Sequence, residues 1–257
     1  MPTDLPRWAA PLLAVQFLTR PPVPILTRLT GEQAAAGLAR AMAWLPPVGT
    51  LIGGVTAGVF VVAGWFWPPL VAAILALVVE ALLTGAFHED AVADFCDAFG
   101  GTASGDRALA IMKDSRIGSY GALGLGLTVV LRIAAIVALP GPVAAAAIIG
   151  AATAGRLCAV TLAAIVAPVG SGAGMAVRAG RMPPGRLALA AVLALPGLAP
   201  ILWLRPGASA AAFGAMFLLL LWLRRFLLAR IGGSTGDCLG FAAAMAQLAL
   251  LLAVAAR

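Results

Sequence analysis

Charged residues are scarce in this sequence. Only 11% of its 257 residues are Asp, Glu, Lys or Arg, whereas 62% are hydrophobic, and the mean hydropathy is +1.04. A soluble domain is about half apolar and about a quarter charged. The composition therefore excludes an ordinary soluble domain and indicates an integral membrane protein.

Cysteine is also rare. The three cysteines, Cys96, Cys158 and Cys238, are dispersed and form no CxxC pair, which argues against both a disulfide framework and a zinc site. Residues 1–24 hold an apolar run too short to span a bilayer and no small-residue cleavage site. We expect this segment to be part of the mature chain, with an interfacial helix as its possible structure.

Basic residues outnumber acidic ones, giving a net charge of +7 and a pI near 10.9. In a membrane protein this excess has an ordinary explanation, because basic residues gather at membrane boundaries. We therefore expect membrane lipid around this chain and no nucleic-acid partner.

Long apolar windows dominate the sequence. Seven of them approach the 20 or so residues that a helix needs to cross a bilayer: 48–66, 69–87, 120–139, 142–168, 187–204, 208–223 and 238–256. Residues 33–47 are apolar too, but they contain Arg40 and the Pro46-Pro47 break, which suggests a shorter or re-entrant element. We predict an all-α polytopic membrane protein with about seven (six to eight) transmembrane helices in a single domain, residues 1–257.

The basic residues predict an orientation. If the N-terminus is cytosolic and the chain alternates, segments 1–47, 88–118, 169–186 and 224–237 face the cytosol and carry thirteen of the seventeen Lys and Arg residues. Arg205 and Arg257 lie on the other side. This positive-inside bias predicts an inner-membrane protein whose polar segments, and any active site, face the cytosol.

The scarce acids are concentrated in "TGAFHEDAVADFCDAFGG", residues 84–101, which holds four of the ten: Glu89, Asp90, Asp94 and Asp97. Asp90, Asp94 and Asp97 would share one face if 88–98 is helical. Like charges on adjacent turns repel, so solvent, an arginine or a divalent cation must compensate. Mg²⁺ prefers oxygen ligands and usually combines a few carboxylates with substrate phosphates. The alternative is an ordinary solvated helix face.

Two further residues extend this cluster. Glu80, in the apolar stretch before it, is an ionisable group within a span and therefore a functional hypothesis. It could equally be a hydrogen-bonded structural carboxyl. His88 is the only histidine. It could act as a base, or as an interfacial group that supports a metal site.

Cationic residues follow in the segment 100–121. Lys113 is the only lysine of the chain, and Arg116 is three residues further on. Beside a carboxylate cluster, these cations suit a substrate that bears several phosphates. Their alternative role is to anchor the segment at the membrane surface.

The last polar patch is "RRFLLARIGGSTGDCLG", residues 224–240. Exposed amides at a helix start, with Thr235 and Arg230, could receive a phosphate. Asp237 could bind substrate or simply cap the helix. Arg156, inside the window 142–168, could reach the same face or bond to a neighbouring helix.

The sequence resembles the cobalamin synthase family, the adenosylcobinamide-GDP ribazoletransferases. The blocks "TGAFHEDAVADFCDAFGG" and "RALAIMKDSRIGSYGALGL" are similar to its signature, as are "FLTRPPVP", "PPVGTLIGG" and "RIGGSTGDCLG". The chain departs from the family at Ala91 and Ala98, where glycine is usual, and at Gln247, where an acid is frequent.

The resemblance implies a specific reaction. A hydroxyl of α-ribazole, or of its 5′-phosphate, would attack the phosphorus attached to adenosylcobinamide. GMP would leave and adenosylcobalamin, or its 5′-phosphate, would form, with Mg²⁺ as cofactor. By the match, the metal ligands would be Glu89, Asp90, Asp94 and Asp97, with Glu80 as a weaker member. Asp94 would be essential for turnover, His88 or a metal-bound carboxylate would accept the hydroxyl proton, and Lys113 and Arg116 would hold the pyrophosphate. The resemblance leaves a homo-oligomer open.

Two rival functions have distinct signatures. A CDP-alcohol phosphotransferase would share acidic residues, metal and a nucleotide leaving group, but that family's DG, AR and G-xxx-D-xxx-D pattern is absent. An ion-coupled transporter would favour charges near the bilayer midplane and repeated halves. Here most acids lie outside the predicted spans.

Overall fold

The computed structural model of this chain describes residues 5–169 and 180–256, and within these parts it is helical with no strand. Residues 170–179 of the predicted polar segment 169–186 lie outside the described residues. The elements in chain order are α1 (Ala9–Leu18), η1 (Pro24–Arg28), α2 (Gly31–Ala41), η2 (Met42–Trp44), α3 (Leu45–Ala63), α4 (Pro69–Thr84), α5 (Phe87–Phe99), α6 (Gly105–Ile111), α7 (Ser119–Val137), α8 (Gly141–Ile165), α10 (Pro184–Leu204), α11 (Pro206–Ile231) and α12 (Gly236–Ala255).

The prediction of an all-α polytopic membrane protein is confirmed. Six described helices are long and apolar enough to cross a membrane, and a bent pair of helices raises the number to seven. Residues 33–47 fall in α2, η2 and the first residues of α3, and the run Gly31–Ala63 counts as one candidate span, so they add no span of their own. Within the predicted window 69–87 the helix ends earlier than expected: α4 stops at Thr84, and α5 leaves it at an angle of 88°.

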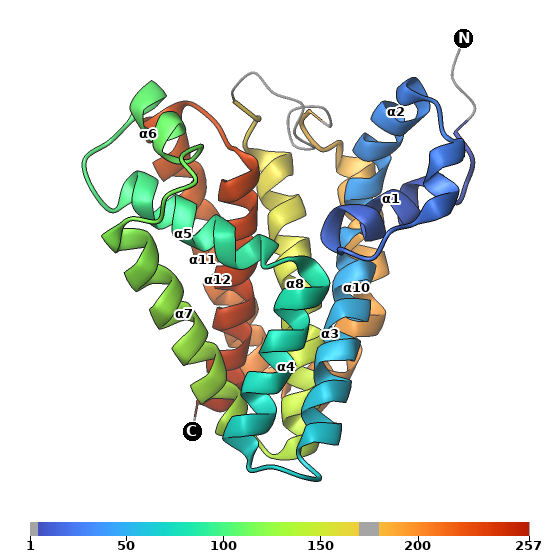
Figure 1. The fold of residues 1–257 in the computed structure, drawn as a ribbon, viewed down its shortest axis with the longest axis vertical. Coiled ribbons are helices and arrows are strands. Elements are labelled where there is room, and N and C mark those ends of the chain that lie inside the picture. The colour runs from blue at the N-terminus through green and yellow to red at the C-terminus, as the bar shows by residue number, and fades with distance from the viewer. Residues whose placement is uncertain (1–4, 170–179, 257) are drawn as a thin grey trace.

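The core of the bundle is built around α8, which lies between α3, α10 and α12 (Figure 1). Small residues allow this close packing. A Cβ atom on Gly49 of α3 would lie 2.6 Å from the carbonyl oxygen of Ala152, and one on Gly53 would lie 2.8 Å from the Cα atom of Ile149. The α3 and α8 backbones therefore touch, and glycine is required at these two contacts.

The break between α4 and α5 is a tight backbone turn. Gly85 and Ala86 both adopt left-handed conformations, with φ of 70° and 56°. The amide of Ala86 donates to the carbonyl of Ala81 at 2.8 Å, which closes the C-terminus of α4. The amide of Arg20 donates to the carbonyl of Leu83 at 2.7 Å, so the N-terminal segment is fastened to the same turn.

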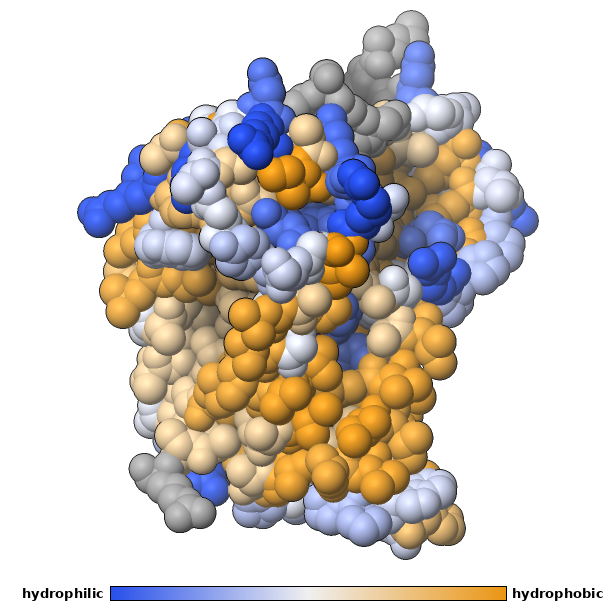
Figure 2. Space-filling view, turned by 60° about the vertical axis from the view of Figure 1, so that its left-hand side comes forward, coloured by the Kyte–Doolittle hydropathy of each residue, from blue (hydrophilic) through white to orange (hydrophobic). Residues whose placement is uncertain are grey.

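The turn directs α5 across the bundle, at the end where α1, α2 and α6 also lie (Figure 1). We call this the polar end. Figure 2 shows hydrophilic residues gathered there, above a flank of hydrophobic residues. Large exposed apolar side chains such as Leu82, Leu123 and Phe217 cover the helices, as expected of surfaces that face lipid.

Candidate functional site

The predicted helix over 88–98 is confirmed as α5, and its two sides differ in chemistry. Val92, Phe95 and Phe99 are buried, and the ring of Phe95 stacks on Phe241 of α12 with centroids 3.8 Å apart. Asp90 is exposed, and Asp94 and Asp97 are half-buried. The apolar side fixes α5 to the bundle, so the three aspartates lie on the other side, which we call the acidic face.

His88 does not belong to the acidic face. Successive helical residues are about 100° apart, so His88, two positions before Asp90, lies on the opposite side of α5. It is 6% exposed and lines a small pocket with Glu89, Arg132 and Gln247. Burial lowers the pKa of His88 well below its usual value, and the charges of Arg156 and Arg132 act in the same direction.

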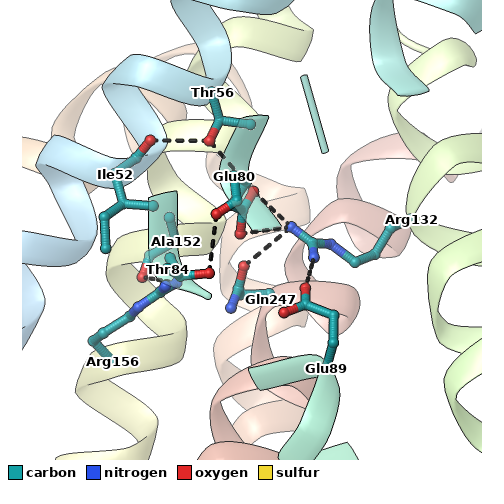
Figure 3. Close-up of polar contacts among 9 residues, drawn as sticks. All are labelled: Ile52, Thr56, Glu80, Thr84, Glu89, Arg132, Ala152, Arg156 and Gln247. Atoms are coloured by element: carbon teal, nitrogen blue, oxygen red, sulfur yellow. Dashed lines mark hydrogen bonds and ion pairs between the residues drawn. The ribbon is translucent and has the colours of Figure 1, made fainter. Parts of the chain in front are cut away.

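Glu80 and Glu89, two of the predicted metal ligands, are paired with Arg132 of α7 (Figure 3). One guanidinium nitrogen of Arg132 is 3.0 Å from both carboxylate oxygens of Glu80, and another is 3.1 Å from an oxygen of Glu89. The hydroxyl of Thr56 donates to Glu80 at 3.3 Å, and Arg132 also donates to Gln247 at 3.4 Å. Glu80 is 4% exposed and Arg132 is 8% exposed. Glu80 thus fits the structural alternative, a paired carboxyl inside the bundle.

Sequence reasoning missed this arginine. Glu80, Arg132 and Arg156 are the charges well inside the predicted spans, and an intramembrane acid is expected to pair with an intramembrane base. That rule could have joined Glu80 to one of the two arginines. It could not have identified Gln247 or Thr56 as partners, because neither residue is charged.

Arg156 lies inside the bundle. It is 1% exposed, and a Cβ atom on Gly49 of α3 would lie 3.0 Å from its Cδ atom. One guanidinium nitrogen donates to the carbonyl of Ala152 at 3.2 Å, while the Nε and Nη2 atoms have no partner among the described residues. The structure therefore places Arg156 beside the Glu80–Arg132 network rather than on the acidic face.

Asp97 is held by the start of α7. One carboxylate oxygen accepts from the amide of Gly118 at 2.7 Å, and the other accepts from the amide of Gly121 at 2.8 Å. The carboxyl groups of Asp90 and Asp94, in contrast, have no hydrogen-bond or ion-pair partner among the described residues.

Three neighbouring carboxylates, those of Asp90, Asp237 and Asp97, all repel the charge of Asp94. Burial and the charges of Asp90, Asp237 and Asp97 raise its pKa to about 6. Asp237, at the start of α12, is thereby placed close to the acidic face. The capping role considered for Asp237 belongs instead to Thr235, whose hydroxyl accepts from the amide of Cys238 at 3.3 Å.

The glycine-rich turn before α12 is largely explained by backbone packing. Ser234 exchanges backbone hydrogen bonds with Ala167 and Val169, each at 2.9 Å. Arg230 donates to the carbonyl of Ala103 at 3.1 Å, and its guanidinium lies 5.3 Å from the centre of the Phe226 ring. Arg230 and Thr235, both predicted to bind substrate, thus have structural partners already.

Lys113 and Arg116 lie in the exposed segment between α6 and α7. Arg116 forms a two-pronged ion pair with Asp114, with a shortest N–O distance of 2.6 Å. The hydrogen bonds from Arg116 lower the pKa of Asp114 to about 2. Exposed pairs contribute little to stability, so the ion pair of Arg116 with Asp114 costs little to break.

Within the described residues, no three His, Cys, Asp or Glu side chains lie close enough to hold a metal ion by themselves. The donor chemistry nevertheless fits magnesium, because Asp90, Asp94 and Asp237 present carboxylates without a cation. Mg²⁺ is usually held by one or two carboxylates together with substrate phosphates, not by an all-protein cage.

These observations define a class: a helical membrane protein whose polar end presents an acidic helix face and a cationic segment suited to a phosphate substrate. Residues 10–255 match the family described as cobalamin-5-phosphate synthase. The chain belongs to that family.

Curated relatives agree with this assignment. The chain is 38% identical to the adenosylcobinamide-GDP ribazoletransferase of Leptothrix cholodnii over 248 residues, which cover 93% of this chain and 92% of the relative. It is 38% identical to that of Rhizobium etli over 254 residues, 94% of each chain. The enzyme of the same name from Shewanella frigidimarina is 36% identical over 253 residues, covering 95% of this chain and 93% of the relative. No solved structure matches the chain.

Proposed function

We propose that this chain is an adenosylcobinamide-GDP ribazoletransferase. It joins α-ribazole, or its 5′-phosphate, to the phosphate on adenosylcobinamide and releases GMP, a late step of vitamin B12 biosynthesis. The observation that carries the proposal is the family match over residues 10–255, supported by relatives of that name that align over more than nine-tenths of both chains.

The acidic face of α5 suits the diphosphate of this substrate. In our proposal Asp90 and Asp94 would hold Mg²⁺, and Asp237, whose charge acts on Asp94, would add a third carboxylate near the ion. The bound ion would neutralise phosphate charge during the transfer. Glu80 and Glu89, already ion-paired with Arg132, would connect α4 and α5 to α7 instead of binding the metal.

Residues of this chain can also accept the proton of the ribazole hydroxyl and stabilise GMP as it leaves. The ribazole hydroxyl forms the new bond to phosphorus, and the bond from phosphorus to the GMP oxygen breaks. We assign the hydroxyl proton to Asp94, because His88 lies on the other side of α5. Lys113 and Arg116 stabilise the departing GMP as cations. Arg116 becomes available when it exchanges Asp114 for phosphate oxygens.

We further propose that the chain lies in the cell inner membrane with its N-terminus and polar end in the cytosol. The support is the distribution of basic residues, thirteen of seventeen of which fall in the segments assigned to that side. The nucleotide substrate and GMP would then be exchanged with the cytosol.

The test is an assay of detergent-purified protein with adenosylcobinamide-GDP, α-ribazole and Mg²⁺. We expect equal amounts of GMP and cobalamin, and no product when a chelator removes the metal. Turnover of CDP-alcohols with a lipid alcohol, and none of the corrinoid, would overturn the proposal. Full activity in the chelator would remove Mg²⁺ from it.

A further inference from the structure

Asp97 performs a capping role for a helix to which it does not belong. Gly118 is the N-cap residue of α7, and as a glycine it has no side chain with which to cap. The N-cap side chain normally accepts from the amide two or three residues into the helix. Asp97 of α5 replaces it: one oxygen accepts from the Gly121 amide at 2.8 Å and the other from the Gly118 amide at 2.7 Å.

Glycines at the start of α7 make room for this contact. A Cβ atom on Gly118 or on Gly121 would collide with the carboxyl group of Asp97. A Cβ atom on Gly124 would collide with the sulfur of Cys96. The first turns of α7 therefore lie directly against the last turns of α5, and a side chain at these positions would separate the two helices.

The contact connects the two halves of the proposed site. Arg116 is only two residues before Gly118, and Lys113 is three residues before Arg116. On the other side of the contact, Asp94 is one helical turn before Asp97 on α5. The contact that fixes Gly118 relative to α5 therefore also sets the distance between the cationic segment and the two aspartates without partners among the described residues, Asp90 and Asp94.

We propose that Asp97 is a positioning residue, not a metal ligand: it holds the start of α7, and with it Lys113 and Arg116, at the distance from Asp90 and Asp94 that a diphosphate requires. This inference rests on the proposed function for its substrate.

The first experiment needs no activity. Hydrogen–deuterium exchange is measured on the peptide spanning residues 115–124 in wild type, Asp97→Asn and Gly126→Ala. Gly126 is the matched control, because a Cβ atom there meets nothing within 4 Å. We expect the Gly118 and Gly121 amides to exchange about tenfold faster in Asp97→Asn, since hydrogen bonds to a charged acceptor are lost, and to be unchanged in Gly126→Ala. Equal exchange in wild type and Asp97→Asn would overturn the proposal.

The second experiment separates positioning from metal binding. GMP release is measured against Mg²⁺ and against the nucleotide substrate for Asp97→Asn, Gly121→Ala and Asp94→Asn. We expect both Asp97→Asn and Gly121→Ala to raise the KM for the nucleotide substrate about tenfold or more. The Mg²⁺ concentration that gives half-maximal activity should stay unchanged in both variants. Asp94→Asn should lose turnover instead.

A rise in the Mg²⁺ requirement of Asp97→Asn, absent from Gly121→Ala, would make Asp97 a ligand and contradict the inference. Gly121→Ala disturbs the same contact from the other helix, so it tests the proposal even where Asp97→Asn folds poorly. If wild type releases no GMP from adenosylcobinamide-GDP, the proposed function fails, while the exchange experiment still decides whether Asp97 holds α7.

Discussion

At the scale of single residues, the five carboxylates predicted to bind metal fall into two groups, those that have partners among the described residues and those that have none there. The sequence does not distinguish the two groups. Glu80 and Glu89 are ion-paired with Arg132, and Asp97 accepts hydrogen bonds from two backbone amides. Asp90 and Asp94 are left without a partner in the part of the chain that the structure describes. Those two are consequently the residues whose replacement should affect chemistry most and folding least.

Replacing Asp94 by Asn should abolish turnover while leaving folding and membrane insertion intact. The amide keeps the size of the side chain but removes the charge that would hold Mg²⁺ and accept the proton. Loss of a group that acts in the transition state typically costs 10²-fold or more, roughly 3 kcal/mol. GMP release at saturating substrate measures the effect, and Glu32→Gln, an exposed acid of α2, serves as control. A near-normal rate in Asp94→Asn would remove Asp94 from the mechanism.

Asp94 should also make the metal-free protein less stable as the pH rises. Its pKa is about 6 in the folded protein against an ordinary 3.8, so folding favours the protonated form. Between about pH 4 and pH 6 the unfolded chain releases this proton first, and stability falls with rising pH.

In the presence of a chelator, Asp94→Asn should therefore melt at a higher temperature than wild type above pH 6, and at the same temperature below about pH 4. Differential scanning fluorimetry in detergent checks this. A melting temperature of Asp94→Asn below that of wild type at pH 8 would contradict the repulsion that the acidic face implies.

At the scale of elements, the turn at Gly85–Ala86 decides where the site lies. It ends α4 and sends α5 across the polar end at 88°. Arg132 of α7 bonds to Glu80 on one side of this turn and to Glu89 on the other, so a single buried side chain spans the angle (Figure 3).

Removing Arg132 alone should destabilise the protein strongly, because it leaves the buried carboxylate of Glu80 without its ion pair and, among the described residues, with only the hydroxyl of Thr56 as a hydrogen-bond donor. Breaking a buried pair costs roughly 3–5 kcal/mol. We expect Arg132→Met to lower the melting temperature well below that of wild type. The double variant Arg132→Met with Glu80→Gln should recover part of the loss. The single variant Glu80→Gln gives the effect of the second substitution alone. If the double variant melts below Arg132→Met by that same amount, the two substitutions act independently, and the pair of Arg132 and Glu80 does not stabilise the turn.

The sequence predicts the helices better than it predicts this turn. Apolar windows such as 120–139 and 142–168 coincide closely with α7 and α8, since length and hydropathy determine a span. The window 69–87 is equally apolar, but the break depends on two left-handed residues, one of which is an alanine. The face shared by Asp90, Asp94 and Asp97 follows from helical spacing. The roles of Glu89 and Asp97 do not, because Arg132 and Gly118 are 43 and 21 residues away.

At the scale of the whole molecule, the polar end collects the N-terminal helices, α5, α6 and the turn before α12 around one surface (Figure 1). The flank below it is hydrophobic (Figure 2). This one-sided distribution of surface residues agrees with chemistry at a membrane surface.

The orientation can be measured with single cysteines introduced at Glu32, on α2, and at Trp203, near the end of α10 and 88% exposed. In sealed spheroplasts, a membrane-impermeant thiol reagent should label the cysteine at 203. It should label the cysteine at 32 only after permeabilisation. The unaltered chain, whose Cys158 and Cys238 are buried and Cys96 half-buried, gives the background. The reverse pattern would place the acidic face outside the cytosol.

The central claim is that Asp90 and Asp94 hold a divalent cation together with the substrate diphosphate. Mn²⁺ can stand in for Mg²⁺, and its electron paramagnetic resonance signal reports the bound fraction. With adenosylcobinamide-GDP present, wild type and Glu32→Gln should bind Mn²⁺ with the same affinity, and the Asp90→Asn, Asp94→Asn double variant should lose binding at least about 100-fold. Equal Mn²⁺ binding by the double variant and wild type would contradict the account.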